Sequence, residues 1–169
     1  MPTHAAPAGV DSDAIVDAVL TASRVLVAVA ARSLGDIAEE VTLTQYRTLV
    51  VLASRGPKSL VELAEAVAVT PPTATRMCDR LIKKGLVVRG NDSGDRRLVR
   101  LTLAERGRDL VDEVTQRRRR EIVELVAAVP EDQRVAMVDS LQRLAAAAGE
   151  VPEQDWSAGW GLETGGRPR

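Results

Sequence analysis

The stretch that decides the fold runs from Thr44 to Leu103: TQYRTLVVLASRGPKSLVELAEAVAVTPPTATRMCDRLIKKGLVVRGNDSGDRRLVRLTL. It begins with an apolar-rich segment that predicts a helix from Gln45 to Ser54. Gly56 and Pro57 follow, and because glycine ends helices and proline cannot continue one, the helix is expected to stop there. Two further short helices and a pair of strands are predicted in the rest of the stretch.

The second and third predicted helices are separated by a very short turn. The second begins after Ser59, and Glu62 stands three residues on, at the spacing of a capping box. The third has Thr70 as its N-cap and ends at Lys84-Gly85, where a cation and a glycine suit a helix C-terminus. Only Val67 to Val69 lie between the two, and helices joined so closely predict a helix-turn-helix.

The third helix has one apolar face and one polar face. Residues at the spacing i, i+3, i+4, i+7 are expected to pack inward, namely Ala74, Met77, Cys78 and Leu81. The opposite face then carries hydroxyls and charges, namely Thr73, Thr75, Arg76, Asp79, Arg80 and Lys83. Hydroxyl groups suit phosphates and base edges, and arginine suits guanine, so this face is a candidate DNA-reading surface.

A two-stranded hairpin is predicted after the third helix. Leu86 to Val88 is a short apolar run, and apolar residues alternate with polar ones from Val99 to Leu103, which is the period of a strand. The connecting turn from Gly90 to Arg97 is polar and ends in Arg96 and Arg97. A helix-turn-helix followed by a hairpin with a basic tip is a winged helix, whose usual partner is duplex DNA.

Charge is distributed unevenly along the chain. The 169 residues carry a net charge of −1, which alone does not indicate nucleic acid. The segment from Gln45 to Leu101, however, holds 11 Lys and Arg against 5 Asp and Glu, whereas the rest of the chain holds 12 against 19. A basic centre on an acidic scaffold is typical of local phosphate binding.

At this level of detail the segment resembles the MarR (multiple antibiotic resistance regulator) family of bacterial transcription factors. The matching residues are Leu43–Arg47, Leu60–Ala64, Thr73–Arg76, Asp79–Leu81, Lys84–Val87, Asp95–Arg97 and Gly107. The Asp-Arg-Arg wing and its spacing to Gly107 are the more discriminating part. The family usually has threonine three residues before that glycine, where this chain has Ala104, and Thr102 is expected to cap the next helix instead.

The resemblance implies a homodimer that binds a pseudo-palindromic operator, with one recognition helix per half-site. It also implies a repressor released by a small aromatic or phenolic effector, bound where Tyr46 lies between the DNA-binding lobe and the dimer helices; Tyr46 is equally well placed as a core residue. Asp95 is expected to hold an arginine by a charge-assisted hydrogen bond. The candidate DNA contacts are Thr70, Pro72, Thr73, Thr75, Arg76, Arg80, Lys83, Arg89, Asp95, Arg96 and Arg97.

Helical segments flank the winged-helix stretch on both sides. Apolar residues recur at helical spacing from Asp13 to Ala38, from Leu103 to Val129, and again after Pro130 up to Gly149. A single small winged helix cannot cover these apolar stripes, so we expect them to pack against a second copy. The predicted organisation is an N-terminal tail (1–11), a dimerisation helix (12–42), a winged helix-turn-helix lobe (43–103), C-terminal dimerisation helices (104–149) and a flexible tail (150–169).

The predicted fold class is thus mainly α with a small β-hairpin wing. Trp156 and Trp160, four residues apart in the tail, leave open an alternative in which that segment docks on the body. The four arginines from Arg117 to Arg120 have Glu113, Glu121 and Glu124 at helical spacing, which predicts surface ion pairs.

Several other classes of protein are disfavoured. The sequence has one histidine, no HExxH motif, no glycine-rich phosphate loop and no nucleophile with a nearby base, so we expect no enzyme, metal or cofactor. No signal peptide is recognisable and no uninterrupted apolar run approaches the roughly 18 residues of a membrane span, so a cytoplasmic location without a membrane partner is expected.

Two alternatives to a ligand-responsive DNA-binding regulator stay open. The first is a winged helix used only for protein interaction, which the basic wing tip disfavours. The second is a thiol-based redox sensor that acts through Cys78, the single cysteine. Because a sensor thiol needs exposure and a lowered pKa, the apolar face on which Cys78 lies favours a packed core residue instead.

Overall fold

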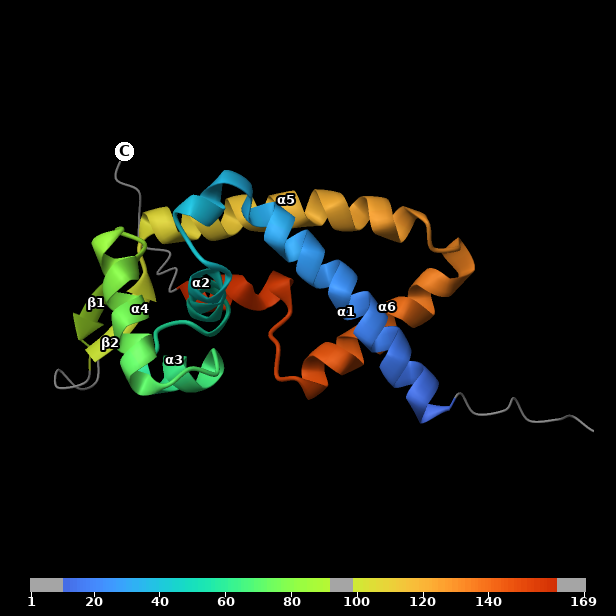
Figure 1. Cartoon of the computed structure of the whole chain (residues 1–169), viewed down its shortest axis with the longest axis horizontal. Helices are drawn as coiled ribbons and strands as arrows, with labels where there is room; N and C mark the ends of the chain where they lie inside the picture. The colour runs from blue at the N-terminus through green and yellow to red at the C-terminus, as the bar shows by residue number, and fades with distance from the viewer. Residues whose placement is uncertain (1–10, 92–98, 161–169) are drawn as a thin grey trace, which may run out of the picture.

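The computed structural model describes residues 11–91 and 99–160, which form an elongated helical body with one small sheet (Figure 1). The predicted fold class, mainly α with a β-hairpin wing, is confirmed. The elements in order are α1 (Ser12–Leu34), η1 (Gly35–Glu39), α2 (Leu43–Arg55), α3 (Leu60–Ala66), α4 (Pro71–Lys83), β1 (Val87–Asn91), β2 (Val99–Leu103), α5 (Glu105–Ala127), α6 (Glu131–Ala147) and η2 (Glu153–Trp160).

Capping boxes fix the starts of α2 and α3. At α3 the predicted box forms, since the Ser59 N–H donates to the Glu62 carboxylate at 2.8 Å and the Glu62 N–H donates to the Ser59 hydroxyl. A second box, between Thr42 and Gln45, starts α2 two residues earlier than predicted. Both boxes satisfy N–H groups that a helix N-terminus otherwise leaves without partners.

The core of the DNA-binding lobe forms around α2. Leu49, Val51 and Ala53 are fully buried, and the neighbouring elements present apolar side chains to the same cluster. The predicted inward face of α4 is confirmed, since its buried residues are Ala74, Met77, Cys78 and Leu81. The opposite, polar face of α4 is thereby turned to solvent.

The hairpin pairs antiparallel, with Val87 opposite Leu103 and Asn91 opposite Val99. Lys58, just before α3, adds an isolated bridge to Leu101, with its N–H donating to the Leu101 carbonyl at 3.0 Å. The prediction that Thr102 caps the following helix was wrong. Thr102 lies in β2, and α5 starts at Glu105 with Ala104 as an N-cap that makes no side-chain hydrogen bond.

The flanking helices leave much apolar surface exposed. On α1, Ile15 and Leu20 are more than half exposed, and α6 has no buried residue. By length and composition alone the segment Ser12–Ile37 could cross a membrane, with a mean hydropathy of 1.9. The segment contains no uninterrupted apolar run of that length, and it meets the criterion because a mean over 18 residues tolerates isolated charges.

The C-terminal segment differs from the expected flexible tail that begins at residue 150. Up to Trp160 it lies against the body, with η2 beside α2 (Figure 1). The alternative in which this segment docks on the body is the one that the structure supports at Trp156. Its indole packs against the core cluster, and its Nε1–H donates to the Val151 carbonyl at 3.1 Å.

Gly107 lies where α5 packs closely against the residue that precedes the hairpin, Leu86. A Cβ atom at this position would lie 2.1 Å from the Leu86 carbonyl oxygen. Although alanine gains about 1 kcal/mol of helix propensity over glycine, this clash involves backbone and cannot relax by a rotamer change. Gly107→Ala should therefore lower the free energy of unfolding by about 1–3 kcal/mol, the usual cost of overpacking, measured by chemical denaturation.

Gly90→Ala serves as the matched control, because a Cβ atom there meets nothing within 4 Å. Equal stability of the two variants would contradict the close approach of α5 to the hairpin.

Candidate nucleic-acid interface and adjoining cleft

The exposed face of α4 presents a row of hydroxyls and cations. Thr73, Thr75, Arg76, Arg80 and Lys83 are all exposed, as the sequence predicted. For the three cations, the structure records no ion pair within residues 11–91 and 99–160. Within that part of the chain, no carboxylate is paired with them.

Hydroxyl groups at the start of α4 are already oriented by local hydrogen bonds. The Thr75 hydroxyl donates to the Pro71 carbonyl at 3.0 Å, and the hydroxyls of Thr70 and Thr73 lie 3.0 Å apart. A Thr75 hydroxyl whose proton is engaged this way offers its oxygen as an acceptor, which suits an amino group on a base edge better than a phosphate. Pro72 is exposed beside them and can offer only apolar contact.

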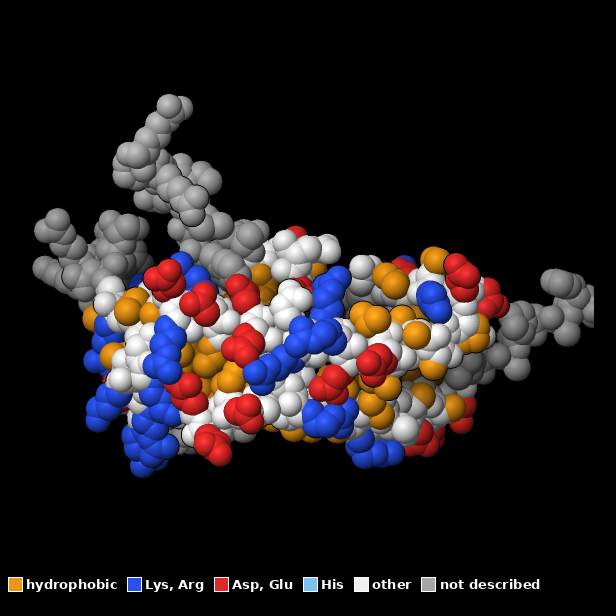
Figure 2. All heavy atoms as spheres, turned by 90° about the horizontal axis from the view of Figure 1, so that it is seen from above, with side chains coloured by type: hydrophobic (Ala, Val, Ile, Leu, Met, Phe, Trp, Pro, Cys, Tyr) orange, Lys and Arg blue, Asp and Glu red, His pale blue; other side chains and the backbone are white. Residues whose placement is uncertain are grey.

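Cations gather at the end of the molecule that carries α4 and the hairpin (Figure 2). Arg89 belongs to this group but is not free, because its guanidinium lies 2.8 Å from the Asp79 carboxylate on α4. Both side chains are 48% exposed, so the pair adds little stability and instead orients β1 against α4. Arg100 pairs with Glu62, which joins β2 to α3. The predicted wing contacts Asp95, Arg96 and Arg97 lie outside the described residues.

A cleft adjoins this interface between α2 and α5. One cavity of about 360 Å³ is lined by Tyr46, Arg47 and Val50 from α2 and by Arg118 from α5. The Arg118 guanidinium lies 5.6 Å from the centre of the Tyr46 ring. The predicted pairing of the arginine run holds for Arg117, which binds Glu113, but Arg118 packs over an aromatic ring instead.

Tyr46 is almost completely buried, at 2% exposure, yet its hydroxyl has no hydrogen-bond partner among the described residues. Burial raises the pKa of Tyr46, while the nearby Thr115 hydroxyl and the Arg118 charge act in the opposite direction. The Nε of Arg118 is also buried without a partner. Two unpaired donors from different helices thus meet in one cleft, and a buried polar group without a partner costs free energy.

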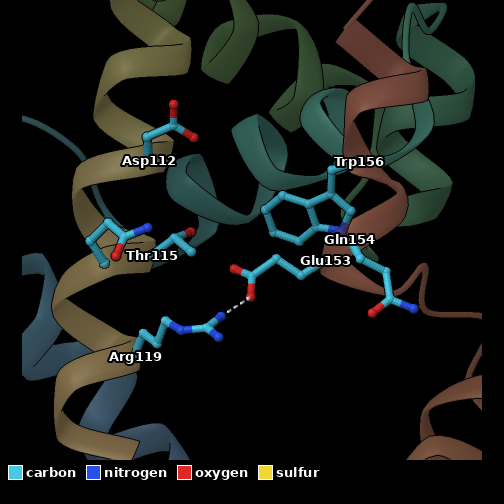
Figure 3. A pocket seen from close by; sticks show the side chains of 7 residues that line it. Asp112, Thr115, Arg119, Glu153, Gln154 and Trp156 are labelled. Atoms are coloured by element: carbon cyan, nitrogen blue, oxygen red, sulfur yellow. Dashed lines mark ion pairs between the residues drawn. The ribbon is translucent and has the colours of Figure 1, made fainter.

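A second cavity of about 470 Å³ continues the cleft between α5 and η2 (Figure 3). Its walls include Asp112, Thr115 and Arg119 from α5, and Glu153, Gln154 and Trp156 from η2. In the close-up the Glu153 carboxylate points across the opening to Arg119, with 3.9 Å between the charged atoms. Both cavities have volumes within the usual range of small-molecule sites.

Comparison with known proteins identifies the lobe that carries these features. The model of the MarR family matches residues 41–99. The HTH-type transcriptional repressor MdtR of Bacillus subtilis (strain 168) is 30% identical over 121 residues, which is 72% of this chain and 78% of MdtR. The chain belongs to the MarR family. Members of this family are transcriptional regulators rather than enzymes.

Solved structures agree with that assignment. The crystal structure of Rv1404 from Mycobacterium tuberculosis is 40% identical, covers 86% of this chain and 99% of its own, and has a TM-score of 0.76. BpsR of Bordetella bronchiseptica, described with a mechanism for regulation of its DNA binding by 6-hydroxynicotinic acid, is 26% identical, covers 86% and 98%, and has a TM-score of 0.57. The family resemblance inferred from the sequence is therefore confirmed.

Sequence reasoning missed Arg118 and the wall that η2 contributes to the cleft. Tyr46 was the only predicted cleft residue, and the structure does place it there. Arg118 carried no distinguishing signal, because it is one of four consecutive arginines. No group of three or more His, Cys, Asp or Glu within the described residues could hold a metal ion.

Cys78 lies on the inner face of α4 and is only 1% exposed. Burial raises the pKa of its thiol, and the neighbouring Asp79 adds to the shift, so the reactive thiolate is disfavoured. The environment of this cysteine therefore argues against the redox-sensor alternative.

We predict that the native protein resists both alkylation by iodoacetamide and oxidation by hydrogen peroxide, and that the unfolded protein reacts with both. Because Cys78 is the single cysteine, the intact mass reports alkylation directly, whereas oxidation is read from the mass of the Cys78 peptide, since the three methionines also take up oxygen. Rapid modification of the native protein by peroxide would revive the redox-sensor alternative.

Proposed function

We propose that this MarR-family regulator is a homodimeric repressor that binds a pseudo-palindromic operator and is released by a small aromatic carboxylate. The observation that carries the proposal is the exposed face of α4, where Arg76, Arg80 and Lys83 stand beside oriented threonine hydroxyls without internal ion pairs in the described part of the chain. Such a face matches what a recognition helix needs in the major groove.

The recognition helix α4 and the wing would make different kinds of contact with DNA. Arginine on α4 is suited to bidentate contact with guanine, so Arg76 and Arg80 would read sequence. Arg96 and Arg97 at the wing tip would enter the flanking minor groove, where negative potential attracts arginine with little regard to base identity. Arg89, held by Asp79, would contact phosphate only if that ion pair exchanged for the DNA backbone.

The effector assignment is supported by the cleft chemistry. Tyr46 and Arg118 offer an unpaired hydroxyl and a guanidinium beside an aromatic ring, and these groups suit a ligand that has both a ring and an anionic or hydroxyl group. The 6-hydroxynicotinic acid of the BpsR study is an aromatic carboxylate of this kind. A ligand wedged between α2 and α5 would alter the position of the DNA-binding lobe, and allosteric release requires such a change.

Dimerisation is supported by the exposed apolar side chains of α1, α5 and α6. Figure 2 shows hydrophobic side chains gathered toward the end of the body away from α4. Val135 is 79% exposed, and Leu141 and Leu144 about half exposed, which is a costly arrangement unless a second copy covers them. A dimer that buries α1 in this way would act in the cytoplasm, and α1 would not enter a membrane.

Operator binding tests the proposal. We predict that Arg76→Ala weakens binding to the operator by about 1–3 kcal/mol while leaving binding to scrambled duplex nearly unchanged. Arg97→Ala should weaken both by similar factors and reduce the salt dependence of binding, since it removes a contact with the backbone potential. Gel shifts with the protein's own upstream DNA at several salt concentrations measure both effects.

If the wing variant loses operator binding alone while Arg76→Ala loses both equally, the two roles have been assigned the wrong way round. Absence of salt-dependent binding to any duplex would favour the alternative of a protein-interaction module.

Dimerisation has its own test. Leu20→Glu places a charge on the exposed apolar face of α1, and we predict that it shifts the protein from dimer to monomer or aggregate in sedimentation experiments. Val61→Glu is the matched control, because Val61 is 61% exposed on α3, away from the proposed interface. A Leu20→Glu protein that remains a dimer would remove α1 from the interface.

A further inference from the structure

The segment from residue 150 to residue 156, here called the C-terminal arm, is held to the body by polar contacts at the surface. Glu150 pairs with Arg47 on α2, and Glu153 lies 3.9 Å from Arg119 on α5. Just before the arm, Arg55 donates to the Gly149 carbonyl at 2.8 Å. Ion pairs this exposed contribute little to stability, so these polar contacts alone do not fix the arm in its position.

The arm lies beside α2 and forms one wall of the cavity against α5, whereas no residue of the arm lines the smaller cavity at Tyr46 and Arg118. Trp156 packs against the core cluster that contains Tyr46, and Glu153 is close enough for its charge to raise the pKa of Tyr46. Figure 3 shows the indole and the Glu153 carboxylate facing Thr115 and Arg119 across the cavity. The Tyr46 hydroxyl nevertheless has no hydrogen-bond partner among the described residues. The arm therefore packs near this hydroxyl but does not form a hydrogen bond with it.

The chemistry of the arm resembles that of the proposed ligand. Trp156 contributes an aromatic ring and Glu153 a carboxylate, and the carboxylate pairs with a guanidinium at the mouth of the cavity. A free aromatic carboxylate would use the same guanidinium and the same apolar wall. It could also offer a partner to the Tyr46 hydroxyl, which the arm does not provide.

We propose that the C-terminal arm is a tethered competitor at the cavity between α5 and η2, where a free aromatic carboxylate must displace Glu153 from Arg119 in order to bind. A short tether gives the arm an effective concentration in the millimolar range, so even a weakly held arm competes with a dilute ligand. The apparent affinity for ligand is then reduced by the fraction of molecules in which the arm is undocked. The class of ligand rests on the proposed function, whereas the docking of the arm does not.

The first test uses Trp156 as its own reporter. Trp160→Phe leaves Trp156 as the sole tryptophan, and the probe ligand is 4-hydroxybenzoate. We expect titration with the probe to shift Trp156 emission to the red and to increase its quenching by acrylamide, as the indole moves into water. Binding of the probe detected by calorimetry without a change at Trp156, or no binding at all, would overturn the proposal.

The second test compares two carboxylate-to-amide substitutions. Glu153→Gln removes the competing carboxylate from Arg119 and should tighten binding of 4-hydroxybenzoate by about fivefold or more, the lower end of coupling between sites. Asp139→Asn changes the charge equally but disrupts only the Arg143 pair on α6, and should leave the affinity unchanged. Equal affinities of Glu153→Gln and the parent protein would overturn competition by the arm.

The third test needs no ligand. Tyr46 is the only tyrosine, so nitration by tetranitromethane reports its accessibility directly. We expect the parent to be protected and both Trp156→Ala and Glu153→Gln to react faster; unchanged protection in both variants would show that the arm does not cover Tyr46. Failure of DNA binding in gel shifts would contradict the proposed function. Ligand affinity, Trp156 emission and Tyr46 nitration would still test the arm, so the two proposals can be refuted separately.

Discussion

Burial of α2 is the constraint on which the rest of the structure depends. Its residues from Leu49 to Ala53 are at most 6% exposed, which for a helix of 13 residues requires neighbours on nearly every side. Those neighbours are α3, β2, α5 and η2. Since each large apolar side chain contributes about 1.5–3 kcal/mol when buried, this one helix fixes the lobe to the long helix α5.

The same arrangement connects the DNA-facing helix α4 and the cleft through one core cluster. The inner face of α4 packs on the cluster that contains α2, and Tyr46 on α2 borders the cleft against α5. On the proposed function, a change in the separation of α2 and α5 would be transmitted to α4, because a close-packed core resists local deformation. The ion pairs Asp79–Arg89 and Glu62–Arg100 connect the hairpin to α4 and α3.

The flanking helices follow a different rule from the lobe. Their apolar side chains are largely exposed in the single chain, although they recur at helical spacing. A second copy of the chain would bury these side chains without any additional segment or a different partner protein.

The sequence by itself determined the features that depend on neighbouring residues. Ser59 and Glu62 predicted the start of α3, the spacing of Ala74, Met77, Cys78 and Leu81 predicted the inner face of α4, and alternation predicted β2, because capping and periodicity act over a few residues. The motifs from Leu43 to Gly107 were specific enough to indicate the family. The predicted start of α5 was wrong because Thr102 and Ala104 were both possible caps. The close packing of α5 against the Leu86 carbonyl places the cap at Ala104.

Only the tertiary structure decided which distant side chains meet. Arg118 was one arginine among four until α5 placed it over Tyr46, 72 positions earlier in the chain. Arg89 was an apparently free cation until the hairpin placed it beside Asp79, and Trp156 belonged to an expected tail until η2 packed against α2. Such contacts depend on the relative positions of whole helices, which are set by the sum of many small packing energies and leave no local mark in the sequence.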